Sequence, residues 1–114
     1  MSTKRVNKVN LAYSMLKMLK YWREEETSQE AKDLVLPGLY LALAYLMHST
    51  LAELAGRHLG NPEYLLTLEK VDGMDALRVK TPAGTSLLVK GRAPDEAYID
   101  ALAEVFMSYY PERG

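Results

Sequence analysis

The residues of this sequence that could do chemistry are few, and their spacing does not form a catalytic or metal-binding motif. The chain has no cysteine and two histidines, His48 and His58, without an HExxH motif or clustered carboxylates. Ser49 and Glu53 share a helix face, but no histidine is placed to activate the hydroxyl. We therefore expect no disulfide, metal site, cofactor or enzymatic activity, and we expect His48 to pack near the end of the apolar run of its helix.

Two sets of basic and aromatic residues are better candidates for a binding surface. The first set lies on one side of a predicted helix and comprises Tyr13, Lys17, Lys20 and Tyr21, and the second shares one face of a predicted sheet and comprises Arg78 and Lys80. Cations neutralise phosphates and phenol rings stack on bases, so both sets predict contact with nucleic acid, most readily a single strand. No RNP motif, zinc finger or basic recognition helix accompanies them, and solvated surface cations are the alternative interpretation.

The charges of the chain are segregated along the sequence although the formal net charge is only −1. Residues 1–23 carry six Lys and Arg and no acid, whereas residues 24–63 carry seven acids against two basic residues. Such blocks predict an electrically dipolar molecule that docks on phosphate with one side and on a basic neighbour with the other. An ordinary solvated surface is the alternative.

The elements that must position these residues begin with two helices. Residues 7–26 have apolar residues at helical spacing, and these are Leu11, Ala12, Met15, Met18, Leu19 and Trp22. Thr27 is followed three residues later by Glu30, a capping-box pattern that predicts a second helix over 28–59. Pro37 either begins a new helix there or kinks the existing one, and Gly60 with the residues after it ends the helix.

The second helix contains an uncharged stretch, residues 34–52, that is almost long enough to cross a bilayer. Pro37, Gly38 and the polar run His48 to Thr50 interrupt it, and amphipathic elements flank it, so we expect a buried core helix and no membrane contact. One broad stripe of this helix comprises Leu39, Leu43, Leu46, Met47, Leu51 and Leu54, and a second, smaller stripe comprises Gly38, Ala42, Tyr45, Ser49, Ala52 and Gly56. Because the helix is apolar nearly all round, we expect another copy or a partner to cover part of it, with complete burial by the other two helices as the alternative.

The rest of the chain predicts three strands and a last helix. Alternating apolar residues indicate strands over 64–71, 75–81 and 85–90, joined by turns at Asp72-Gly73 and at residues 81–84. The strand residues expected to face the core are Leu66, Leu68, Leu77, Val79, Leu87 and Val89. A helix over 94–110 follows, with a core stripe of Tyr98, Ala101, Leu102, Val105, Phe106 and Tyr109. The predicted fold is a single α+β domain over 1–114, a core of about three helices with a three-stranded antiparallel meander inserted before the last helix.

Residues 29–47, QEAKDLVLPGLYLALAYLM, carry a resemblance to a known family. A Leu/Ala-rich helix after a Pro-containing start resembles the small helical subunits of archaeal CRISPR effector complexes. The resemblance implies a non-catalytic subunit that stacks beside copies of itself and helps to hold target or displaced DNA in antiviral defence. The meander departs from the all-helical members, and no binding residue of the family aligns with this sequence.

These observations lead to two functional hypotheses. The first is a non-enzymatic nucleic-acid-binding accessory subunit of a larger nucleoprotein complex, such as a CRISPR effector. The alternative is a homodimeric interaction or regulatory module in which the small stripe is the self-contact. The start of the chain has no uninterrupted apolar core or small-residue cleavage site, which predicts a cytoplasmic protein, and the scarcity of Gln and Asn is typical of a thermophile.

Overall fold

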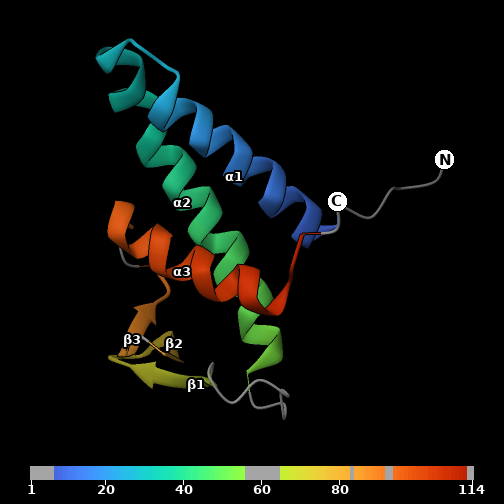
Figure 1. Ribbon diagram of the computed structural model, residues 1–114. Helices are drawn as coiled ribbons and strands as arrows, with labels where there is room; N and C mark the ends of the chain where they lie inside the picture. The colour runs from blue at the N-terminus through green and yellow to red at the C-terminus, as the bar shows by residue number, and fades with distance from the viewer. Residues whose placement is uncertain (1–6, 56–64, 83, 92–93, 113–114) are drawn as a thin grey trace, which may run out of the picture.

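The computed structural model describes residues 7–55, 65–82, 84–91 and 94–112, and within these ranges it confirms the predicted α+β class. The helices are α1 (Lys8–Glu24), α2 (Gln29–Leu54) and α3 (Glu96–Tyr109). The strands β1 (Leu65–Val71), β2 (Met74–Thr81) and β3 (Gly84–Val89) form one antiparallel sheet in the order β1-β2-β3. The three helices pack together, and the sheet lies at one end of them beneath α3 (Figure 1).

Capping residues decide where the first two helices begin. The Asn7 side chain accepts hydrogen bonds from the amides of Val9 and Asn10, at 3.0 and 3.2 Å, and so satisfies two donors at the start of α1. The Ser28 hydroxyl does the same for Ala31 at the start of α2, at 3.2 Å. The sequence pattern at residues 27–30 therefore located the beginning of α2 within one residue.

The second helix differs from its prediction in two ways. It is one continuous helix from Gln29 to Leu54, so the expectation that Pro37 starts a new helix is wrong. Proline has no amide hydrogen, which leaves the carbonyl of Asp33 without its usual helical donor inside that helix. The helix ends at Leu54, before the predicted Leu59, because Ala55 takes an extended ψ of 135°; residues 56–59 lie outside the described ranges.

The core lies where α2 packs against α1, α3 and the sheet. Its largest fully buried side chains are Phe106, Leu43, Met47, Leu51, Leu77, Ile99, Leu102, Val79 and Val105. The broad stripe predicted on α2 faces this core with Leu39, Leu43, Met47 and Leu51, whereas Leu46 and Leu54 are only partly buried. Leu46 and Leu54 therefore lie at the edge of the stripe.

The apolar face of α1 is rotated from its prediction. Ala12 and Leu19 are buried, but Leu11 and Met18 are about half exposed. Tyr13, which was expected on the solvent side, instead packs against Phe106 with ring centroids 5.6 Å apart. The reason is that α1 is covered by both α2 and the end of α3, so its buried side is centred between two neighbours.

The pairing of the strands corrects the predicted orientation of β3. Leu77 in β2 is directly opposite Leu68 in β1 and Leu88 in β3, so these three residues share one face of the sheet. Leu87 pairs with Arg78 and therefore lies on the other face, as does Val89. The predicted inward orientation of Leu87 and Val89 is wrong, because the turn after Thr81 sets a register one residue away from the one assumed.

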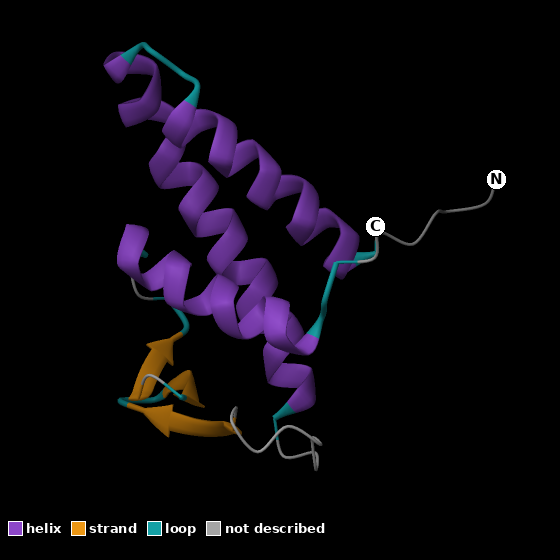
Figure 2. Ribbon diagram, viewed as in Figure 1, coloured by secondary structure: helices purple, strands orange, loops and turns teal. Residues whose placement is uncertain are grey.

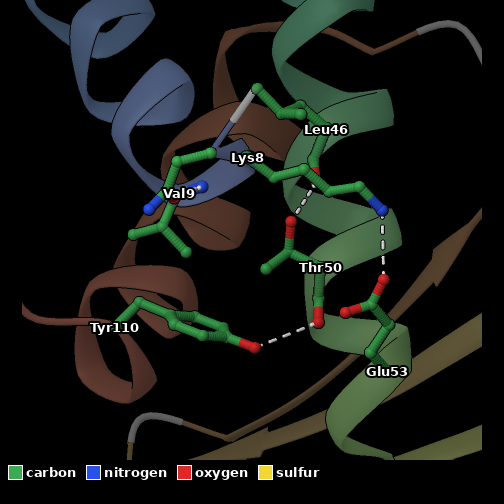
Figure 3. A network of polar contacts seen from close by, with 7 residues as sticks. Lys8, Val9, Leu46, Thr50, Glu53 and Tyr110 are labelled. Carbon is green, nitrogen blue, oxygen red and sulfur yellow. Dashed lines mark hydrogen bonds and ion pairs between the residues drawn. The ribbon is translucent and has the colours of Figure 1, made fainter. Parts of the chain in front are cut away.

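Polar contacts join the end of α3 and the start of α1 to the C-terminal turns of α2 (Figure 3). The Thr50 hydroxyl donates to the Leu46 carbonyl at 2.7 Å, and the Tyr110 hydroxyl donates to the Thr50 carbonyl at 3.3 Å. On the same helix, Glu53 forms an ion pair with Lys8 at 3.0 Å. These contacts hold the start of α1 and the end of α3 against α2.

Candidate functional site

The residues predicted on α1 are divided by the structure into packing and surface residues. The Tyr13 hydroxyl donates to the carbonyl of Tyr110, and burial, followed by the charge of Glu112, raises the pKa of Tyr13. Its ring is thus part of the contact between α1 and α3 and is not free to stack on a base. Tyr21 is about half exposed, and its hydroxyl donates to Glu26 at 3.4 Å.

The two lysines of this set differ in their partners. Lys17 lies 3.1 Å from the carboxylate of Glu112, at the rim of a groove of about 710 Å³ between α1 and the end of the chain. Tyr13 lines the same groove. Lys20 is exposed and forms no ion pair with any residue in the described part of the chain. Within the described ranges one cation of the predicted set, Lys20, therefore has no acidic partner.

The predicted pair on the sheet is divided in the same way. Arg78 donates two hydrogen bonds to the carboxylate of Glu69, at 2.8 and 2.9 Å, and this pairing lowers the pKa of Glu69. Lys80 lies two residues further along β2, on the same face of the sheet as Arg78. It is exposed and has no ion pair within the described ranges. The sheet is separated from α1 by α2 and α3 (Figure 2), so the two sets do not form one surface.

Basic residues of α1 form surface ion pairs with acids from distant parts of the chain. Arg23 of the basic block pairs with Asp100 at 2.9 Å and with Glu96 at 3.7 Å, and its guanidinium lies 5.6 Å from the centre of the Tyr40 ring. Together with the pairs of Lys8 and Lys17, this contact compensates three of the basic residues of α1. Only one of these acidic partners, Glu53, belongs to the acidic block 24–63, whereas the others lie on α3 or directly after it.

His48 has a structural role between α2 and β3. It is buried, and its Nε2 lies 3.2 Å from the Leu88 carbonyl, which can only accept a hydrogen bond. Burial is the main cause that lowers the pKa of His48, so the ring is neutral at pH 7. Within the described ranges no group of three His, Asp or Glu side chains could hold a metal ion.

An uncovered apolar face of α2 is the most distinctive surface of the molecule. Three large side chains project from it at helical spacing, with Leu34 exposed to 77%, Leu41 to 59% and Tyr45 to 65%. Between them, Gly38 and Ala42 are exposed as well. The sequence predicted a stripe of small residues here but did not place Leu34 and Leu41 on it. The feature that could have indicated them is that α2 carries more leucines than two neighbouring helices can cover.

A cavity of about 400 Å³ opens at the C-terminal end of this face, between α2, the sheet and the start of α3. Small residues of α2, Ala44, Ser49 and Ala52, form much of its wall. Leu68 lines it from β1 and is about half exposed, although its neighbour across the sheet, Leu77, is fully buried. The cavity remains because the side chains of α2 at these positions are too small to fill the space between the helix and the sheet.

One cation lies at this cavity. Lys90 lines it, and its Nζ lies 5.7 Å from the centre of the Tyr45 ring. The nearby Asp75 forms its ion pair with Lys70, which lowers the pKa of Asp75. Lys90 itself has no ion pair with the residues that the structure describes.

By length and composition α2 could also cross a membrane, and it is the one described helix of that kind. This is weak evidence, because the core helix of a soluble protein passes the same test and 39% of the apolar window is buried inside the molecule.

Comparisons of the chain with protein-family models, curated proteins and solved structures find no match.

Proposed function

We propose that this chain is a non-catalytic, homodimeric protein-interaction module that associates through the exposed face of α2. The observation that carries the proposal is the row of Leu34, Leu41 and Tyr45, whose exposed fractions are 77%, 59% and 65%. Large apolar side chains that lie together on a surface mark interaction sites, because covering them removes apolar area from water.

Replacing Tyr45 by Glu tests this function. Sedimentation equilibrium at micromolar concentration is expected to give twice the chain mass for the wild type and the single chain mass for Tyr45→Glu, because a carboxylate cannot be buried in an apolar interface. Met107→Glu on α3 is the matched control, since Met107 is 46% exposed but lies away from this face, and it should remain dimeric. Circular dichroism checks that both variants keep their helices.

Two results would contradict the proposal. A wild type that sediments as a single chain up to 100 times that concentration would show that the α2 face does not bind a second copy. A Tyr45→Glu variant that remains dimeric would place the dimer contact on another surface.

A nucleic-acid-binding accessory subunit is the second candidate function. The observation that favours it is the pair Lys20 and Tyr21, a cation without an ion pair and a half-exposed ring next to each other on α1. The resemblance to the small subunits of archaeal CRISPR effector complexes belongs to this candidate and stays a prediction. Such a subunit would use α1 for the nucleic acid and α2 for its neighbours.

Charge reversal on α1 tests this candidate. Fluorescence anisotropy with a labelled single-stranded oligonucleotide at low salt is expected to show binding that weakens as salt rises, with about tenfold or greater loss in the variant carrying both Lys17→Glu and Lys20→Glu. A variant carrying Arg78→Glu and Lys80→Glu reports on the sheet surface in the same assay. Wild-type protein that binds neither DNA nor RNA oligonucleotides at low salt would remove this candidate.

A further inference from the structure

The arrangement of side chains on α2 indicates the relative orientation of the two copies in the proposed dimer. We infer that the two α2 helices pack antiparallel around a two-fold axis that passes between residues 41 and 42, with Leu34 of each copy inserted into the cavity at Ser49 of the other. This inference rests on the proposed homodimer and specifies its geometry. It is argued from side-chain size, from the cavity and from charge.

Side-chain size selects the antiparallel orientation. In a two-fold interface residue i of one copy meets residue j of the other, and j meets i. With the axis between residues 41 and 42, each large side chain meets a small one: Leu34 is opposite Ser49, Tyr45 is opposite Gly38, and Leu41 is opposite Ala42. A parallel pair would instead set Tyr45 against Tyr45 and Gly38 against Gly38, a collision beside a gap.

Gly38 gives independent support for a close neighbour. A Cβ atom added at Gly38 would meet no heavy atom within 4 Å, so nothing in the single chain requires glycine. Glycine inside a helix costs about 1 kcal/mol relative to alanine. Its presence on an exposed face is explained if the Tyr45 ring of a second copy lies directly over it.

The cavity and its charge fit the same arrangement. Ser49 lines the cavity of about 400 Å³, and Leu34, the most exposed of the large apolar side chains of the described residues, would enter it from the other copy. The antiparallel orientation also brings Asp33 of one copy within about 8 Å, along the helix axis, of Tyr45 of the other, because each residue rises by about 1.5 Å. Lys90 lies 5.7 Å from the centre of that ring and has no ion pair in the described chain, although its charge contributes to lowering the pKa of Asp75, so an acidic residue of the second copy would add a second acidic neighbour to this cation.

Disulfide cross-linking tests this geometry directly, because the natural chain has no cysteine. Under mild oxidation Ala42→Cys is expected to cross-link to itself nearly completely, since residue 42 lies beside the two-fold axis. Leu34→Cys alone and Ser49→Cys alone should not cross-link, whereas an equal mixture of the two, one carrying a size tag, should give the mixed dimer. Ser108→Cys on α3, outside the face, is the control for random oxidation.

The outcomes separate this inference from the proposed function. Efficient self-linking of Leu34→Cys, with none in the mixture, would indicate a parallel pair and overturn the inference while the dimer itself remains. A dimer in sedimentation without a cross-link at residue 42 would overturn it as well. A wild type that sediments as a single chain would remove both the inference and the proposed function.

Discussion

Replacing Phe106 by Ala is expected to lower the free energy of unfolding by about 3–5 kcal/mol, because it removes a buried ring and leaves a cavity. Phe106 is fully buried, and its ring lies 5.6 Å from that of Tyr13 and 5.3 Å from that of Tyr110, measured between centroids. It therefore joins α3 to α1 through its aromatic contact with Tyr13. A loss of this size is a large share of the stability of a small domain, about 5–15 kcal/mol.

Urea denaturation followed by circular dichroism measures this loss at one fixed chain concentration, because dimerisation adds to stability by mass action. Met107→Ala is the control, since its side chain is the next along α3 and about half exposed. The control is expected to change the free energy of unfolding by less than about 1 kcal/mol. If Phe106→Ala does not fold, Phe106→Leu, which keeps most of the apolar volume, should fold with a smaller loss. Equal losses in Phe106→Ala and Met107→Ala would contradict the packing described for α3.

Leu43→Ala is expected to cost about 2–5 kcal/mol, the range for a leucine whose removal leaves a buried cavity. Leu43 is fully buried near the centre of α2, the helix that packs against both α1 and α3. Leu46→Ala should cost less, because Leu46 is only partly buried on the same helix. The comparison uses the same denaturation measurement, and a loss at Leu46 as large as at Leu43 would mean that α2 is rotated from the orientation described.

The sequence predicted the types of the elements well, because each type has its own periodicity. Apolar spacing of three and four residues indicated the helices, and alternation with turn residues such as Asp72-Gly73 indicated the strands. The capping-box pattern of Thr27 and Glu30 placed the start of α2 within one residue, although the residue that caps the helix is Ser28. Each of these signals depends on residues that are close together in the sequence, so it can be interpreted without the tertiary structure.

The rotation of the helices and the register of β3 could not be predicted in the same way. Tyr13 faces inward because α1 lies between two neighbours, and a periodicity does not say how many neighbours a helix has. Leu88 and not Leu87 faces the core because one residue more or less in a turn exchanges the two faces of a strand. Both outcomes depend on contacts between segments far apart in the chain.

The features of the candidate site also fall into those that the sequence determined and those that only the tertiary structure decided. The sequence by itself determined that the chain has no cysteine chemistry, that residues 34–52 are too apolar to be solvated on all sides, and that the charges lie in blocks along the chain. Only the tertiary structure decided that Lys17, Arg23 and Arg78 are compensated by acids, and that the face of α2 with Leu34 and Tyr45 is uncovered. The physical reason is that composition and spacing set how much apolar surface and charge must be accommodated, whereas ion pairing and burial depend on which distant segments the fold brings within a few ångströms of each other.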